Sequence, residues 1–212
     1  MATRAAGTPP RDTRLTARGA ATRERIVAAA ADLMYAGGAG ATTLDDVRAA
    51  AGVSKSQLYR HFADKDALVQ AVIALRGQQV LERETRRLGR LSSLDGLARW
   101  RDAVVAASAR QGGAHGCVLG SMASELADSD EQARARVAGL LRQWEALLAA
   151  GLGRMRDAGI LRPDADPGRL AVGLMAALQG GYLLADTARD ARRLEIALDL
   201  ALEGIQAYAR PA

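Results

Sequence analysis

The stretch that decides the fold runs from residue 43 to residue 65 and reads TLDDVRAAAGVSKSQLYRHFADK. It predicts two short helices joined by a tight turn at Gly52, because a helix often ends in a left-handed residue that glycine adopts most easily. Each helix opens with a capping box, which pairs Thr43 with Asp46 and Ser54 with Gln57. Two helices around a glycine turn, the second opening with small polar residues, are typical of a helix-turn-helix that reads DNA.

Hydrophobic periodicity predicts further helices on both sides of this motif. We expect an earlier helix over about residues 20–35 and later helices over about residues 64–88, 94–109, 117–127, 130–158, 167–187 and 190–209. The composition agrees, since 49% of the residues are hydrophobic but only 3% are aromatic. The prediction is an all-α fold, in which an N-terminal three-helix helix-turn-helix domain precedes an all-helical domain.

The N-terminal segment resembles the DNA-binding domain of the TetR family. The residues that carry this resemblance are Thr42-Thr43, Ala51-Gly52-Val53-Ser54, Leu58-Tyr59, His61-Phe62 and Lys65-Asp66-Ala67-Leu68. The resemblance implies a transcription regulator whose C-terminal helical domain dimerises and encloses a small-molecule pocket.

We divide the chain into three regions. These are a flexible basic arm over residues 1–18, a helix-turn-helix domain over residues 19–65, and a ligand-binding and dimerisation domain over residues 66–212. The arm would lie along a phosphate backbone or in a minor groove, or be only a disordered leader. Residues 1–65 hold 10 Lys and Arg against 6 Asp and Glu, and residues 66–212 hold 19 against 18. The positive excess lies where phosphates are expected, as counterion release requires.

The candidate DNA contacts gather on and around the second helix of the motif. Lys55, Ser56 and Gln57 would project toward base edges in the major groove, although Gln57 could serve the cap alone. The family resemblance implies phosphate contacts for Tyr59, His61 and Lys65, and the threonines before the first helix would add others. The full set is Thr42, Thr43, Ser54, Lys55, Ser56, Gln57, Tyr59, His61 and Lys65.

The C-terminal half offers rings and methionines for a ligand pocket, although the same residues at helical spacing also build ordinary cores. The candidate lining residues are Trp100, Met122, Leu126, Trp144, Leu148, Met155, Met175, Leu178, Gln179 and Tyr182. The segment from His115 to Asp128 is similar to a branch of the family that answers to flavonoids and other aromatic drugs. That similarity implies a small apolar or aromatic effector.

Small and large apolar residues alternate over residues 167–209 and predict a pair of helices that dimerises. Small residues let helix backbones approach, and leucines supply the buried apolar area. The candidate interface residues are Leu170, Gly173, Leu174, Ala177, Gly181, Leu194, Leu198, Ala201 and Ile205. A two-fold axis between two such pairs would match a palindromic operator, whereas the alternative is that both helices only close the core of a monomer.

Other classes of function have little support in the sequence. Cys117 is the single cysteine, and with His115 it provides too few ligands for a metal site. No phosphate-binding glycine loop or nucleophile with its base is recognisable, so we expect no metal, no cofactor and no enzymatic activity. No apolar run reaches the roughly 18 residues of a membrane span, and no signal-peptide core is present, so a cytoplasmic location without membrane contact is expected.

The sequence thus predicts a ligand-responsive repressor that leaves a palindromic DNA operator when a small apolar or aromatic effector binds to the homodimer. The alternatives are a DNA-binding regulator or structural protein without an effector, and a helical enzyme.

Overall fold

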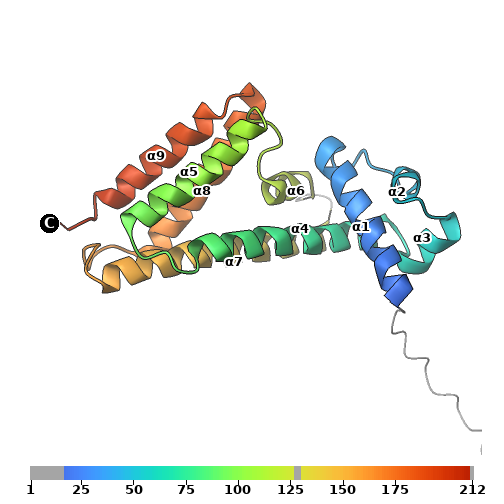
Figure 1. The fold of residues 1–212 in the computed structure, drawn as a ribbon, viewed down its shortest axis with the longest axis horizontal. Coiled ribbons are helices and arrows are strands. Elements are labelled where there is room, and N and C mark those ends of the chain that lie inside the picture. The colour runs from blue at the N-terminus through green and yellow to red at the C-terminus, as the bar shows by residue number, and fades with distance from the viewer. Residues whose placement is uncertain (1–16, 127–129, 211–212) are drawn as a thin grey trace, which may run out of the picture.

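The computed structural model describes residues 17–126 and 130–210. Over these residues the chain forms nine α-helices and no sheet, with one isolated bridge between Leu161 and Ala209 (Figure 1). The helices are α1 (Ala17–Gly37), α2 (Leu44–Ala51), α3 (Lys55–His61), α4 (Lys65–Leu88), α5 (Leu94–Arg110), α6 (Val118–Leu126), α7 (Glu131–Asp157), α8 (Pro167–Ala188) and α9 (Arg192–Gln206). The predicted all-α fold is confirmed, while most of the predicted basic arm, residues 1–16, lies outside the described residues.

Helices α1 to α3 form one end of the molecule, drawn in blue and cyan in Figure 1. At the start of α2, the Thr43 side chain accepts a hydrogen bond from the Asp46 backbone N–H. The helix ends at Gly52, whose φ of 62° and ψ of 43° are left-handed. The Ser54 side chain accepts the Gln57 N–H at the start of α3. Both predicted capping boxes and the left-handed glycine are confirmed, and together they set the turn between the two helices.

Apolar side chains from four helices hold this end together. Ile26 of α1, Val47 of α2, Leu58 of α3 and Leu68 of α4 are at most 1% exposed. Phe62, directly after α3, packs into the same core, and the Arg23 guanidinium lies 5.1 Å from its ring centroid. The first turn of α4 therefore belongs to the core of the DNA-binding end.

Helix α4 continues from this core into the C-terminal part. Its 24 residues span about 36 Å at about 1.5 Å per residue, and it runs beside α7 (Figure 1). Gly77 marks the close approach of the two helices, since a Cβ there would lie 2.6 Å from Cδ2 of Leu140. One rigid element thus connects the two ends of the molecule.

Helices α8 and α9 form a tight antiparallel pair that packs on α7 and α5. Gly181 of α8 makes the approach possible, because a Cβ there would lie 2.8 Å from Cδ1 of Leu194. By length and apolar composition, α8 is the described helix that could span a membrane. Its inner face is occupied by Leu174 and Leu178, which are buried against neighbouring helices, so we interpret it as a core helix.

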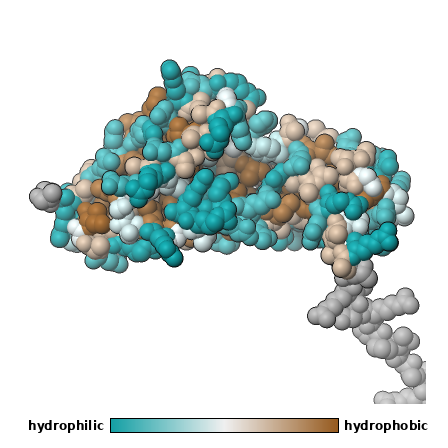
Figure 2. All heavy atoms as spheres, in the orientation of Figure 1, coloured by the Kyte–Doolittle hydropathy of each residue, from teal (hydrophilic) through white to brown (hydrophobic). Residues whose placement is uncertain are grey.

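The outer faces of α8 and α9 are apolar and lie open in the single chain. Large hydrophobic side chains stand out there, and they are Val172 (52% exposed), Leu183 (68%), Leu184 (51%), Ile196 (58%) and Leu200 (62%). We call these five residues the outer apolar face. On the side of the molecule drawn in Figure 2, hydrophobic patches lie among hydrophilic ones, also in the recess beside the N-terminal helices.

Candidate DNA-binding surface and effector cavity

The exposed surface of α3 is polar and basic. Lys55, Ser56, Tyr59 and Arg60 all point to solvent, and Tyr59 is 47% exposed although it is a large aromatic residue. The Lys55 ammonium lies 5.9 Å from the Tyr59 ring centroid. Donors and a phenol on a protruding, capped helix are suited to phosphates and to base edges in a major groove.

Gln57 takes part in the cap of its own helix. Its Oε1 accepts the Ser54 backbone N–H at 2.8 Å, while the Ser54 hydroxyl accepts the Gln57 N–H at 3.2 Å. The Gln57 amide nitrogen has no hydrogen-bond partner within the described part of the chain, so it can still donate to an acceptor outside the protein. Capping and base reading are thus compatible for this residue.

Other predicted DNA contacts have internal partners. Thr42 is 6% exposed and its hydroxyl donates to the Gly38 carbonyl at 2.8 Å, so this hydroxyl is not offered to a phosphate. The Thr43 hydroxyl is engaged with Asp46 in the capping box. Lys65 Nζ donates to the Gly40 carbonyl at 2.9 Å, which ties α4 to the turn before α2.

His61 is half-buried at the end of α3. Its pKa is lowered, first by desolvation and then by the charges of Arg60 and Arg23, so the ring is neutral at neutral pH. Its Nε2 is buried without a hydrogen-bond partner among the described residues. This nitrogen is therefore not offered to a phosphate.

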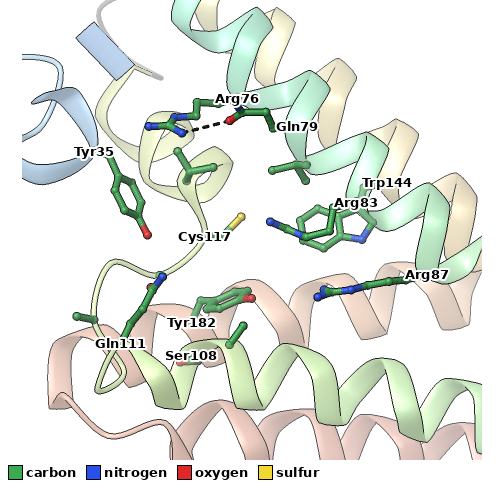
Figure 3. Close-up of a pocket in the computed structure, with 15 residues that line it drawn as sticks. Tyr35, Arg76, Gln79, Arg83, Arg87, Ser108, Gln111, Cys117, Trp144 and Tyr182 are labelled. Atoms are coloured by element: carbon green, nitrogen blue, oxygen red, sulfur yellow. Dashed lines mark hydrogen bonds between the residues drawn. The ribbon is translucent and has the colours of Figure 1, made fainter. Parts of the chain in front are cut away.

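A cavity of about 270 Å³ lies between the two ends of the molecule. Figure 3 shows the polar side chains that converge on it from α1, α4, α5, α7 and α8. Its wall consists of Tyr35, Arg76, Gln79, Val80, Arg83, Arg87, Ala107, Ser108, Gln111, Ala114, Gly116, Cys117, Val118, Trp144 and Tyr182. A second pocket of about 440 Å³ adjoins it and shares Gly116, Cys117 and Tyr182.

The arginines of α4 dominate the polar part of this wall. Glu84, which is fully buried behind it, accepts from Arg83 Nε at 2.7 Å and from Arg87 Nη1 at 3.3 Å. Trp100 Nε1 donates to the other oxygen of Glu84 at 2.9 Å. One carboxylate thus orients two guanidinium groups at the edge of the cavity.

The remaining ionisable groups of the wall are neutral at neutral pH. Burial raises the pKa values of the Tyr35 and Tyr182 phenols. Burial also raises the pKa of the Cys117 thiol, although its polar neighbours Gly120 and Gln179 oppose this shift. The cavity therefore keeps the positive charge of its arginines.

The structure brings two of the predicted ligand-binding residues to this cavity, Trp144 and Tyr182. Gln179 lines the adjoining pocket, and its Nε2 is buried without a partner among the described residues. Trp100 lies on the far side of Glu84 and anchors that carboxylate. The remaining candidates are buried in the core and line neither of the two pockets: Met122, Leu126, Leu148, Met155, Met175 and Leu178.

Most of the predicted dimer residues are buried or half-buried within the single chain. Five of them are buried inside the single chain, because α8 and α9 pack against each other while α8 also packs on α7 and α9 on α5: Leu174, Gly181, Leu194, Leu198 and Ile205. Leu170, Ala177 and Ala201 are half-buried, and Gly173 is exposed. The large hydrophobic side chains that stay exposed on α8 and α9 are those of the outer apolar face.

The sequence interpretation missed Tyr35, Ser108, Gln111 and the three arginines of the wall. A signal was available for the arginines. Arg76, Arg83 and Arg87 are spaced by seven and four residues, which places them on one face of a helix, together with Val80. Positive charge on a face that also carries apolar residues indicates a polar cavity rather than a closed core.

Two contacts connect the C-terminal part directly to the DNA-binding end. Glu125 of α6 accepts the backbone N–H groups of Ala39, at 2.9 Å, and of Gly40. His115, in the segment between α5 and α6, has its ring centroid 5.1 Å from that of Tyr35 in α1. The backbone N–H of His115 donates to the Asp186 carboxylate of α8 at 3.0 Å. The contacts of Glu125 and of the His115 ring, like α4, connect the N-terminal helices to the C-terminal part.

A recognition helix at one end, a cavity at the other and a helix common to both make up the organisation of a helix-turn-helix transcription regulator. Residues 26–72 match the family described as bacterial regulatory proteins, tetR family, and residues 93–201 match the tetracyclin repressor-like C-terminal domain. The chain belongs to the TetR family and is a DNA-binding transcription regulator without enzymatic function.

Similar proteins agree over nearly the whole chain. An uncharacterised HTH-type transcriptional regulator of Mycobacterium tuberculosis is 29% identical over 181 residues, covering 82% of this chain and 89% of that protein. The HTH-type transcriptional repressor DhaR of Mycobacterium sp. is 25% identical, covering 86% and 91%. The crystal structure of a TetR transcriptional regulator from Chloroflexus aurantiacus superposes with a TM-score of 0.82 at 29% identity, covering 93% of this chain and all of that one.

Proposed function

We propose that this protein is a cytoplasmic repressor that binds a pseudo-palindromic operator as a homodimer and is released when a small organic effector enters the cavity. Repression is supported by DhaR, a relative described as a transcriptional repressor. The basic, exposed surface of α3 supports operator binding through the major groove.

The observation that carries the effector proposal is that Tyr35 of α1 and five residues of α4 line the cavity. An effector in the cavity would touch α1, which belongs to the DNA-binding end, and α4, which follows α3 in the chain. A ligand shifts a conformational equilibrium only by as much as it prefers one state over the other. An effector that fits best when α1 and α4 have moved would therefore change the position of α3.

The outer apolar face supports the homodimer. A monomer rarely leaves contiguous large hydrophobic side chains at exposures above one half, and here they lie on neighbouring helices. Gly173, Ala176 and Gly180 lie on the same side of α8, where small residues allow a second helix to come close. In a dimer with a two-fold axis at this face, operator binding would require the two recognition helices to lie about 34–36 Å apart, one DNA turn.

The test of this proposal is a mobility shift with the protein's own upstream DNA, repeated with fractionated small-molecule extracts and a panel of aromatic compounds. A compound that binds the protein and releases the DNA is the expected result. A regulator without an effector would keep the same operator affinity throughout the panel and the extracts.

The Glu125 contact provides a matched variant. In Glu125→Ala the two N–H groups of the turn before α2 lose their acceptor, so the effector should still bind but release less DNA. Glu131→Ala, an exposed acidic residue at the start of α7, is the control and should respond like the wild type. Equal release by both variants would mean that coupling does not pass through α6.

A further inference from the structure

The cavity wall carries an excess of positive charge. No described Asp or Glu side chain lines it, whereas Arg76, Arg83 and Arg87 do. Arg76 is paired with Asp32 at 2.8 Å, and this aspartate is 80% exposed on the outer surface. Arg83 and Arg87 share the single carboxylate of Glu84, so this pair of cations is only half neutralised.

These arginines also keep hydrogen-bond donors free. Arg83 uses only Nε toward Glu84, and Arg87 uses only Nη1, so the remaining guanidinium donors have no acceptor among the described residues. Figure 3 shows both side chains extending from α4 toward the space beside Cys117 and Tyr182. Because a guanidinium presents parallel N–H groups, it matches the two oxygens of a carboxylate.

A further donor of the wall lacks a partner as well. Trp144 is 1% exposed, lines the cavity, and its Nε1 is buried without an acceptor in the described part of the chain. Because this N–H has no accessible surface, Trp144 offers a ligand the face of its ring rather than a donor. The described wall thus has no carboxylate, while its guanidinium groups keep free donors.

The rest of the wall is suited to a flat ring. Tyr35, Trp144 and Tyr182 supply aromatic surfaces, and Val80 and Val118 supply aliphatic ones. The volume of about 270 Å³ lies just below the usual range of ligand pockets, which is about 300–1,000 Å³. A ligand of one or two rings fits this size.

We propose that the cavity recognises an aromatic carboxylate, with the carboxylate on the free donors of Arg83 and Arg87 and the ring between the tyrosines and Trp144. This rests on the proposed function, because it names the chemistry of the effector. It also narrows the small apolar or aromatic effector expected from the sequence, since a neutral hydrocarbon would leave the guanidinium groups without an anion.

The decisive comparison uses 1-naphthoate and 1-naphthamide, which share the ring and the number of non-hydrogen atoms and differ in charge. Calorimetric titration of the full-length protein should show naphthoate binding at least about tenfold more tightly, because charge-assisted hydrogen bonds are roughly twice as strong as neutral ones. Inorganic phosphate, an anion without a ring, should not displace naphthoate at equal concentration.

Variants of α4 assign the preference to the cavity. Arg83→Gln should weaken naphthoate binding about tenfold and naphthamide binding less than about twofold, while Arg83→Lys should keep part of the preference. Arg86→Gln is the matched control, because Arg86 lies on the same helix outside this cavity and is exposed. Circular dichroism of each variant verifies that the helices are intact.

The proposal is overturned if naphthamide binds as tightly as naphthoate, if Arg83→Gln keeps the full preference, if phosphate competes equally, or if neither probe binds at millimolar concentration. Operator release separates this result from the proposed function. Release by a neutral compound that shows no dependence on Arg83 would leave the effector-responsive repressor standing and remove the anion site. Naphthoate binding through Arg83 with unchanged operator affinity would support the anion site but remove the release of DNA by this ligand.

Discussion

Gln57 shows how one side chain can serve both the fold and the DNA. Its oxygen closes the capping box of α3, while its amide nitrogen is free to donate. We expect Gln57→Ala to relax operator preference at one or two base positions, by about 1 kcal/mol for the lost hydrogen bond from this nitrogen. Competition binding against single-base operator variants measures this effect.

Ser54→Ala is the control for that prediction. It removes the other half of the same capping box, at a cost of about 1 kcal/mol in stability, without removing the amide. If both variants kept the full base preference, Gln57 would be a capping residue only.

His61 should make the stability of the DNA-binding end depend on pH. Its pKa in the folded protein lies below that of the unfolded chain because burial and the neighbouring arginines disfavour the charged ring. As the pH falls below about 6.5, the unfolded chain takes up this proton first, so the free energy of unfolding decreases until the pH passes the folded pKa. Urea titrations between pH 7.5 and pH 5 should show this decrease, and His61→Gln should reduce it. An identical pH profile for the variant would exclude this role.

Glu84 holds the most consequential buried charge of the described residues. It is fully buried and accepts from Arg83, Arg87 and Trp100. Glu84→Ala would leave these donors facing an empty site, and we expect a loss of about 3 kcal/mol in the free energy of unfolding. Glu82→Ala, on the exposed side of the same helix, should change it by less than about 0.5 kcal/mol. Chemical denaturation of both variants tests the difference.

At the scale of elements, the contact between α4 and α7 depends on the absence of a side chain. A Cβ at Gly77 would meet the Leu140 side chain at 2.6 Å, so Gly77→Ala should destabilise the protein by about 1–3 kcal/mol even though alanine favours helices. Gly153→Ala in α7 meets nothing within 4 Å and should stabilise it by about 0.5–1 kcal/mol. Thermal unfolding compares the two. A stabilising Gly77→Ala would show that the helices can separate without loss.

At the scale of the whole molecule, the dimer should depend on residues that the single chain leaves exposed. Leu200→Glu places a charge on the outer apolar face and should yield helical monomers with weakened operator affinity. Leu198→Glu is the contrasting variant, because Leu198 is fully buried within its own chain and a charge there should unfold the C-terminal helices. Sedimentation and circular dichroism distinguish these outcomes, and a dimeric Leu200→Glu would place the interface elsewhere.

The sequence by itself determined the helices and the turn of the helix-turn-helix motif. The capping boxes at Thr43 and Ser54, the left-handed Gly52 and the caps at Asp64 and Asp130 are local, because each involves residues within a few positions of one another. For the same reason, hydrophobic periodicity placed every helix boundary within a few residues of where the structure has it. Caps and helical periodicity depend only on residues that are close together in the sequence, so they can be predicted from it.

Only the tertiary structure decided which faces meet. Leu198 and Leu200 both belong to an apolar helix, yet one is buried in the chain and the other is exposed, because α8 and α5 cover a single side of α9. The cavity likewise depends on Tyr35, Arg83 and Tyr182, which are far apart in sequence and meet only when α1, α4 and α8 pack. Periodicity identifies a face, but the choice of its partner is a property of the assembled core.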